Sequence, residues 1–196
     1  MAEAAIRLPK ERRPRDASRL ESRIAILDAA RRVAARDGAR DLSLRGVAAE
    51  AGFAPAALYG YFRNKDELLL ALAAEDLTQL ARAMKGAGGL AGAGAAALDM
   101  LRGTETMAAA SAALTTGPQD KTNDAERLFN GRLIAALKAL SDASGLKSDS
   151  RQNQCDVVLV ASALTGLALL SRSGRLSALG FAPEEILARL DTRFRG

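Results

Sequence analysis

Apolar residues recur at three- and four-residue steps along most of this 196-residue chain. This spacing is typical of amphipathic α-helices, and no segment shows a convincing strand pattern. The first helix starts at Arg19, and Gly38 follows it where a C-terminal cap belongs. Its apolar positions are Leu20, Ile24, Leu27, Ala30 and Ala34. We therefore expect an all-α fold of about nine helices.

Two short helices are predicted next, separated by a glycine turn. Ser43 suits the N-cap of the first helix, with Leu42 and Val47 placed to pack across it. Gly52 ends that helix, and Pro55 suits the first position of the second. Two short helices joined in this way describe a helix-turn-helix, although an ordinary helical hairpin in a core remains the alternative at this point.

Helical patterns continue to the end of the chain. Asn64 is predicted to cap a long helix that runs to about Lys85, and the glycine-rich segment 86–94 is predicted to be a flexible break. Two GxGxxA patterns begin there, but no strand precedes them, so they do not predict a dinucleotide site. Further helices are expected at 98–103, 104–114, 126–140, 157–170 and 183–194, with turns at 115–120 and 141–145.

Charge is concentrated at the N-terminal end. Residues 1–65 hold 14 Lys and Arg against 8 Asp and Glu, whereas residues 66–196 hold 14 against 15. A basic module on a nearly neutral body indicates a polyanionic partner for that module alone. Residues 1–18 are predicted to be a disordered basic arm, either solvated or reaching into a DNA minor groove.

Missing residue types exclude several classes of protein. The chain has no His and one Cys, so the usual zinc sites, histidine-based nucleophile pairs and disulfide frameworks cannot form within it. We therefore expect no metal site, no cofactor and no enzyme activity. There is no N-terminal signal pattern, and the apolar run at 157–170 is too short to span a bilayer. These features favour a cytoplasmic protein with no membrane partner.

Residues 19–70 resemble the DNA-binding domain of the TetR family of transcriptional regulators. The resemblance rests on ILDAARRVAARDG, on LSLRGVAAEAGF and above all on LYGYFRNKDELL, which is similar to the family's Leu-Tyr-x-x-Phe-x-x-Lys-x-x-Leu signature. The rest of the chain matches the family only in being helical. The resemblance implies a helix-turn-helix domain at 19–66 and a ligand-binding and dimerisation domain at 67–196.

The function implied by this resemblance is ligand-responsive regulation of transcription. Such a protein is a homodimer on a palindromic double-stranded DNA operator, most simply a repressor that a small-molecule effector releases. A small helical enzyme or ligand carrier that shares only the N-terminal fold is the alternative. The lack of His and of any acid/base cluster argues against the enzyme, and the uneven charge argues for DNA binding.

The DNA contacts are assigned partly by resemblance and partly from side-chain chemistry. By resemblance Arg45 is the candidate for a guanine contact, and its guanidinium can bond O6 and N7 together. Small apolar residues at the start of the recognition helix can meet thymine methyls, and the two tyrosines and Lys65 can reach phosphates. The tyrosines could instead be half-buried packing residues. The predicted DNA-binding residues are Ser43, Arg45, Pro55, Ala56, Ala57, Tyr59, Tyr61 and Lys65.

The body offers weaker signals. The run 157–170 is apolar on most sides, so we expect a four-helix dimer interface from 152–172 and 183–195, with burial inside the monomer as the alternative. Cys155 is expected to be an interface residue rather than a redox switch. An apolar effector would suit a pocket rich in Met, although these residues could equally fill a core. The candidate ligand-binding residues are Met84, Met100, Met107 and Phe129.

Overall fold

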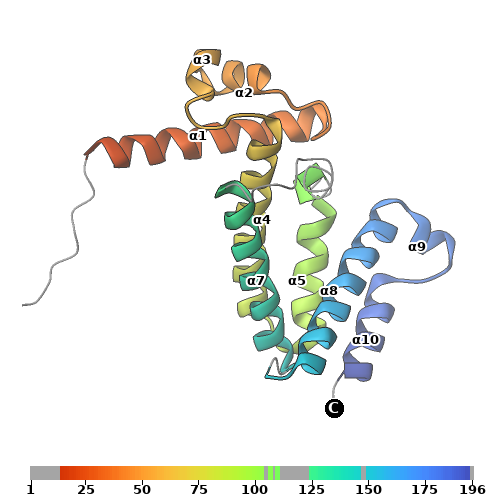
Figure 1. Ribbon diagram of the computed structural model, residues 1–196. Coiled ribbons are helices and arrows are strands. Elements are labelled where there is room, and N and C mark those ends of the chain that lie inside the picture. The colour runs from red at the N-terminus through yellow and green to blue at the C-terminus, as the bar shows by residue number, and fades with distance from the viewer. Residues whose placement is uncertain (1–13, 104–105, 108, 111–123, 147–148, 195–196) are drawn as a thin grey trace, which may run out of the picture.

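The computed structural model describes residues 14–103, 106–107, 109–110, 124–146 and 149–194 (Figure 1). A head made of α1 (Pro14–Asp37), α2 (Leu44–Ala51) and α3 (Pro55–Leu58) lies across one end of a helical body. The remaining helices are α4 (Lys65–Lys85), α5 (Gly89–Gly103), α7 (Asp124–Ser144), α8 (Arg151–Arg172), α9 (Arg175–Ala178) and α10 (Pro183–Phe194). The described residues thus form nine helices and no strand, which confirms the all-α prediction.

Local signals set the ends of the head helices as the sequence predicts. The Ser43 hydroxyl accepts a 3.1 Å hydrogen bond from a backbone amide in the first turn of α2. Gly52 ends α2 with a left-handed φ of +72°, and Pro55 takes the first position of α3. The Asn64 side chain caps α4 through a 2.8 Å hydrogen bond. Each of these helix ends in the head is therefore set by a single residue.

The first helix begins earlier than the sequence pattern suggests. Helix α1 starts at Pro14, so residues 14–18 of the predicted arm are helical, while residues 1–13 lie outside the described part of the chain. Leu20 and Ile24 are 40% and 48% exposed, because the N-terminal half of α1 extends past α4 (Figure 1). Only the later apolar positions of α1, from Ile26 onward, are buried in the head.

Helix α4 belongs to two hydrophobic cores at once. Every residue from 68 to 74 is buried, so this stretch is covered on all sides. Leu68, Leu69 and Leu72 pack in the head core with the fully buried Phe62. The other apolar side of α4 packs in the body core, and its residues are Leu70, Ala73, Leu77, Ala81 and Met84. The head is therefore joined to the body by one continuous helix.

The break predicted at 86–94 is limited to residues 86–88, because α5 begins at Gly89. Gly92 and Gly94 lie inside this helix. A Cβ on Gly94 would stand 2.8 Å from Leu187 Cδ2 and 3.2 Å from Leu164 Cδ2, so the glycine allows α8 and α10 to approach α5 closely. Glycine at this position serves packing between helices rather than chain flexibility.

The remaining connections differ from the sequence expectations in smaller ways. Helix α7 continues to Ser144 and ends at Gly145 with a φ of +71°, so the predicted turn at 141–145 begins too early. The short α9 was not predicted, and it follows Gly174, which has a φ of +68°. The predicted turn at 115–120 lies outside the described residues, as does most of the helix expected at 104–114, of which 106–107 and 109–110 are helical.

Helices α8 and α10 use their apolar residues differently. The stripe of α10, which includes Leu187 and Leu190, packs against the core of its own chain. Helix α8 buries Val157, Val160 and Leu164 but leaves other large apolar residues exposed. Helix α8 extends beyond the apolar run 157–170 at both ends, and with 22 residues it is long and apolar enough to cross a membrane. Helices in the core of a soluble protein also meet this criterion of length and composition.

The two glycines of α5 give a test of its packing. Ala at position 92 meets ordinary contacts at 3.5 Å, so Gly92→Ala should stabilise the fold by up to about 1 kcal/mol through helix propensity. Gly94→Ala gains the same propensity but crowds two leucines, and it should be less stable than Gly92→Ala by about 1–3 kcal/mol. Urea unfolding of both variants measures the difference. Equal stabilities would show that α5 is not closely packed at Gly94.

Candidate nucleic-acid interface

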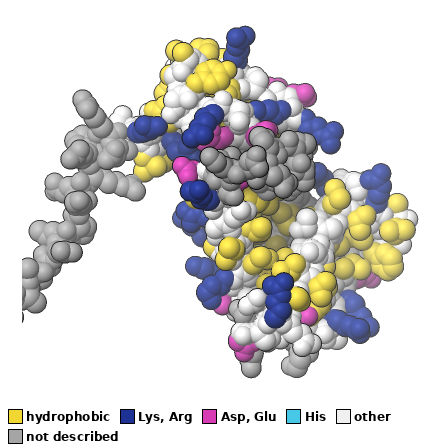
Figure 2. Space-filling view, in the orientation of Figure 1, with side chains coloured by type: hydrophobic (Ala, Val, Ile, Leu, Met, Phe, Trp, Pro, Cys, Tyr) yellow, Lys and Arg dark blue, Asp and Glu magenta, His cyan; other side chains and the backbone are white. Residues whose placement is uncertain are grey.

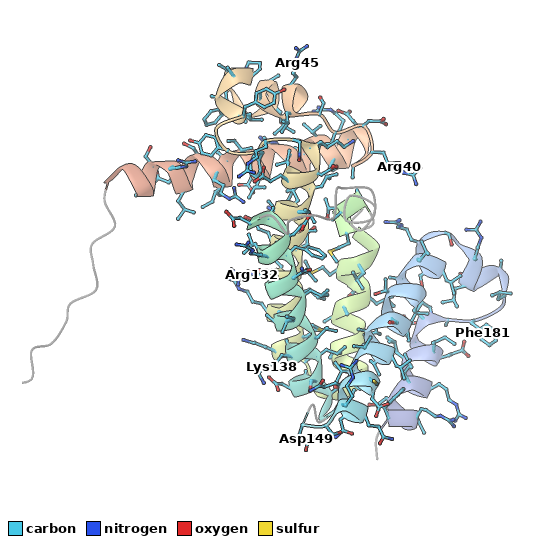
Figure 3. All side chains as sticks on the ribbon, in the orientation of Figure 1. Arg40, Arg45, Arg132, Lys138, Asp149 and Phe181 are labelled. Carbon is cyan, nitrogen blue, oxygen red and sulfur yellow. The ribbon has the colours of Figure 1, made fainter. Side chains whose placement is uncertain are left out.

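The end of the head that faces away from the body carries most of the predicted DNA-binding residues. Helices α2 and α3 lie on one side of α1, and the body lies on the other (Figure 1). Arg45 is exposed and points away from the body (Figure 3). Its side chain makes no ion pair or hydrogen bond within the described part of the chain. Pro55, Ala56 and Ala57 are exposed on α3, and Tyr59 is 55% exposed just after it.

Three predicted DNA-binding residues have structural partners. The Ser43 oxygen accepts the capping hydrogen bond of α2, which leaves its O–H free to donate. Tyr61 is half-buried, with its ring edge-on to Phe53 at 6.5 Å. The Lys65 ammonium donates to the backbone carbonyl of Arg40, and this contact fixes the charge at the start of α4. The alternative that the tyrosines are half-buried packing residues therefore fits the ring of Tyr61, but not that of Tyr59.

Helix α1 contacts the turn that follows α3 through two arginines. Arg19 donates a 3.0 Å hydrogen bond to the carbonyl of Gly60 and lies 5.7 Å from the centre of the Tyr61 ring. One turn later, the guanidinium of Arg23 lies 4.6 Å from the centre of the Phe62 ring. Sequence reasoning missed both residues. Their four-residue spacing on α1 is a signal for a shared face, but not for what that face contacts.

A second pair of arginines fixes α2 to α1. Arg32 and Arg36 donate to the two carboxylate oxygens of Glu50 at 2.7 and 3.1 Å. The hydrogen bonds from Arg32 and then Arg36 lower the pKa of Glu50. Glu50 therefore stays ionised at neutral pH, and this contribution to stability is lost only as pH falls through its lowered pKa. Because these ion pairs are exposed to solvent, they add little to the free energy of folding. Their main effect is to orient α2 against α1.

Residues 26–72 match the profile of a family described as "Bacterial regulatory proteins, tetR family". A 67-residue stretch is 48% identical to the HTH-type nicotine-responsive transcriptional repressor HdnoR of Paenarthrobacter nicotinovorans. Residues 26–72 thus resemble the N-terminal domain of tetR-family regulatory proteins. The HdnoR alignment covers 34% of this chain and 34% of the relative, so the chain spans about a third of the length of that curated protein.

The fold of the whole chain, including the body, is similar to that of solved regulators. The structure matches a TetR transcriptional regulator from Rhodococcus sp. RHA1 with a TM-score of 0.69 at 19% identity, over 90% of this chain and 97% of that one. It also matches the regulator FadR of Bacillus subtilis in complex with stearoyl-CoA, with a TM-score of 0.54 at 17% identity, over 86% and 95% of the two chains. At these identities the matches establish the fold alone.

An ion-pair network joins the head to the body. Arg31 of α1 lies 2.7 Å from Glu75 and 3.6 Å from Asp76, both on α4. Asp76 is only 6% exposed and accepts a hydrogen bond from the hydroxyl of Thr106. Burial opposes the charge of Arg31, but the hydrogen bond and charge of Glu75, followed by the charge of Asp76, raise its pKa. One buried carboxylate thus links α1, α4 and the segment that follows α5.

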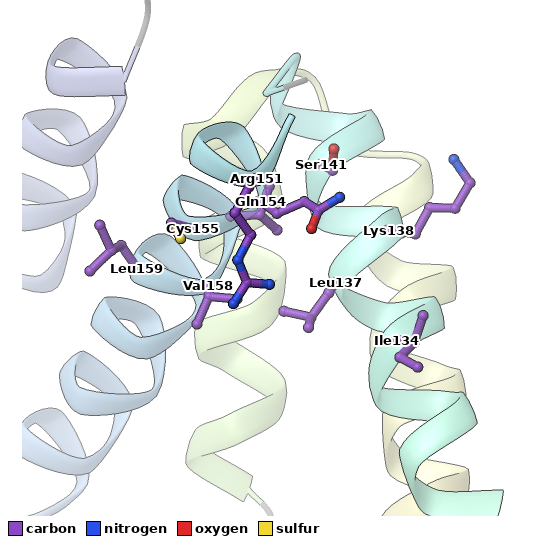
Figure 4. A pocket seen from close by; sticks show the side chains of 10 residues that line it. Ile134, Leu137, Lys138, Ser141, Arg151, Gln154, Cys155, Val158 and Leu159 are labelled. Carbon is purple, nitrogen blue, oxygen red and sulfur yellow. The ribbon is translucent and has the colours of Figure 1, made fainter. Parts of the chain in front are cut away.

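Three of the four predicted ligand-binding residues lie in or against the core of the body. Met84 and Phe129 are buried in the body core, Met107 packs against it, and Met100 is half-buried. A cavity of about 670 Å³ lies elsewhere, between α7 and α8 (Figure 4). Its walls are largely apolar, Arg151 reaches from α8 toward α7, and the exposed Cys155 lies on its α8 side. Sequence reasoning had no signal for this cavity, because its walls come from two distant helices.

Arg45 and Arg40 form a matched pair for testing base readout. Both are exposed arginines of the head, but Arg40 points away from the α2–α3 surface (Figure 3). Arg45→Ala should lose about 1–3 kcal/mol of binding free energy on operator DNA and much less on random-sequence DNA. Arg40→Ala removes the same charge and should cause a smaller loss, alike on both DNAs. Fluorescence anisotropy titrations at one fixed salt concentration measure all four affinities. Parallel losses for Arg45→Ala would disprove its reading of a base.

Proposed function

We propose that this chain is a transcriptional regulator that binds a roughly palindromic operator as a homodimer and is released by a small molecule bound to its body. The observation that carries the proposal is the exposed surface of α2 and α3. It presents an exposed guanidinium, three small apolar residues and a phenol on the side of a basic head that faces away from the body. We place the protein in the cytoplasm, where its operator would be, and assign it no enzymatic activity.

The chemistry of this surface divides its residues by role. Arg45 reads a guanine, while Pro55, Ala56 and Ala57 contact methyl groups and add no hydrogen-bond donor from their side chains. Tyr59, Tyr61 and Lys65, with the Ser43 hydroxyl, contact phosphates and so set the register. With one strong base-reading side chain in each head, DNA shape contributes part of the specificity.

The outer face of α8 supports a homodimer. Val158, Leu159 and Leu169 are 51%, 58% and 60% exposed, and the small residues Ser162 and Gly166 lie between them along the same face. Figure 2 shows hydrophobic side chains gathered on this side of the body, over α8 and α9. Because the apolar stripe of α10 packs inward, we centre the dimer contact on α8, with the polar outer face of α10 at its edge.

Two features of the body support an apolar effector. The first is the adaptable Met-containing core, with Met84, Met107 and Phe129 and the half-buried Met100 on the same helix α5 that packs against it, and the second is the apolar cavity between α7 and α8. The names of the relatives mention nicotine and stearoyl-CoA, which differ greatly in size and charge. The effector of this chain therefore has to be found by experiment. A thermal-shift screen of apolar compounds does so, since a bound ligand stabilises the fold by mass action.

Selection from a random DNA library tests the function before any operator sequence is identified. The full chain should enrich an inverted repeat whose half-sites are centred about 34–36 Å apart, or a multiple of a helical turn. This result follows from two recognition helices held on one face of the DNA. Sequencing of the selected pool shows whether a motif emerges. No enriched motif, or a single half-site only, would contradict the proposed mode of binding.

A charged residue on the outer face of α8 should separate the dimer. Leu169→Glu buries a carboxylate in the proposed interface and should give monomers, with operator affinity lowered roughly a hundredfold because the two heads are no longer linked. Leu20→Glu is the control, since Leu20 is exposed on the head and not on α8. Light scattering gives the mass, and anisotropy gives the affinity. A dimeric Leu169→Glu protein would place the interface elsewhere.

A further inference from the structure

A second cavity, of about 430 Å³, lies where the head meets the body. Three helices form its walls: α1 contributes Arg23 and Ile24, α4 contributes Arg82, and α7 contributes Leu128 and Arg132. The cavity therefore touches the head, the connecting helix and the body at the same time. Neither the DNA-binding surface nor the proposed effector sites use these residues.

The charge of this cavity is unbalanced. Its lining includes three arginines and one carboxylate, Glu75, which is already bound by Arg31 at 2.7 Å. Arg82 and Arg132 form no ion pair with a carboxylate in the described part of the chain, and Arg23 lies over the ring of Phe62. Figure 2 shows basic side chains gathered along this edge of the body, below the head. Cations that share a cavity without counter-charges repel one another, and an anion relieves this repulsion.

DNA does not account for these arginines. The cavity lies on the side of α1 that faces the body, whereas α2 and α3 lie on the opposite side (Figure 1). A duplex bound to α2 and α3 is separated from the cavity by α1 itself. The anion that suits this place has to be small enough to enter a 430 Å³ space.

The same cavity has an apolar side. Ile24 and Leu128 are 48% and 40% exposed, and they approach the cavity from α1 and α7. Leu27, Ala71 and Ala74 complete its apolar lining. An apolar group placed there would remove both large side chains from water, at a gain of roughly 25 cal/mol for each Å² buried.

We propose that this cavity binds a small organic anion, with its carboxylate or phosphate on Arg82 and Arg132 and its apolar part against Ile24 and Leu128. A guanidinium can form two parallel hydrogen bonds to either kind of oxyanion, so the two head groups share one recognition chemistry. The ligand contacts α1 and α7 at once and thereby ties the head to the body. This site is distinct from the effector sites proposed above and does not depend on their occupancy.

Octanoate, 1-octanol and octylammonium test the proposal on the full chain, because they share a tail and differ in head-group charge. Isothermal titration should show octanoate binding, with much weaker binding of the other two. In the double variant Arg82→Gln/Arg132→Gln, the Kd for octanoate should rise at least about tenfold, as expected for the loss of charge-assisted hydrogen bonds. Inorganic phosphate added as a competitor shows whether a phosphate head group takes the same place.

The control variant is Lys85→Gln/Arg127→Gln, which removes two cations from the same helices, outside the cavity. Its Kd for octanoate should stay within about twofold of the parent value, since distant surface charges are screened by salt. Equal losses in both variants, an unchanged Kd in the Arg82→Gln/Arg132→Gln protein, or equal binding of octanol would overturn the site. Operator selection without octanoate tests the proposed function separately, because neither variant alters the α2–α3 surface.

Discussion

The burial of residues 68–74 of α4 on all sides is the constraint on which the rest of the structure depends. A stretch of helix that is apolar around its whole circumference has to be covered from more than one direction, and here the head covers one side while the body covers the other. Neither core is complete without α4. The orientation of the head therefore follows from how this one helix packs, and any change of packing in the body acts directly on it.

The polar partners of Asp76 further restrict how α1 can be oriented on α4. Asp76 is a buried carboxylate in the middle of α4, and its compensation comes from Arg31 of α1 and from the hydroxyl of Thr106. A buried charge that loses its partners is costly, so α1 cannot leave α4 without a penalty. This contact is long-range in sequence and depends on the direction of its hydrogen bonds and charges, whereas the apolar contacts of the cores on either side are non-directional. It is therefore the part of the junction most sensitive to geometry.

Predictions from the sequence were most accurate at helix ends and turns, where a single residue determines the local backbone geometry. Ser43, Gly52, Pro55 and Asn64 could be placed because caps and turns depend on few neighbours. These predictions failed at Gly94, because a glycine that permits close packing and a glycine that permits a turn look alike until the neighbouring helices are known. The stripe of α10 likewise predicts an apolar contact without saying which chain supplies it. Arg19, Arg23 and Arg31 act across distances of about forty residues, and no local pattern reveals such partners.

The glycines of α5 also bear on the dynamics of the body. Each glycine inside a helix lowers its intrinsic stability by about 1 kcal/mol relative to alanine, and α5 carries Gly92 and Gly94 in its first two turns. Its helicity thus depends on contacts with α4, α7, α8 and α10 rather than on its own backbone. Backbone amides of α5 should exchange with solvent by local opening, at a lower free energy than those of α4, which is held by two cores. Helix α5 consequently opens at a lower free energy than the neighbouring α4. Fluctuations of the body can therefore begin in α5 while the head stays folded.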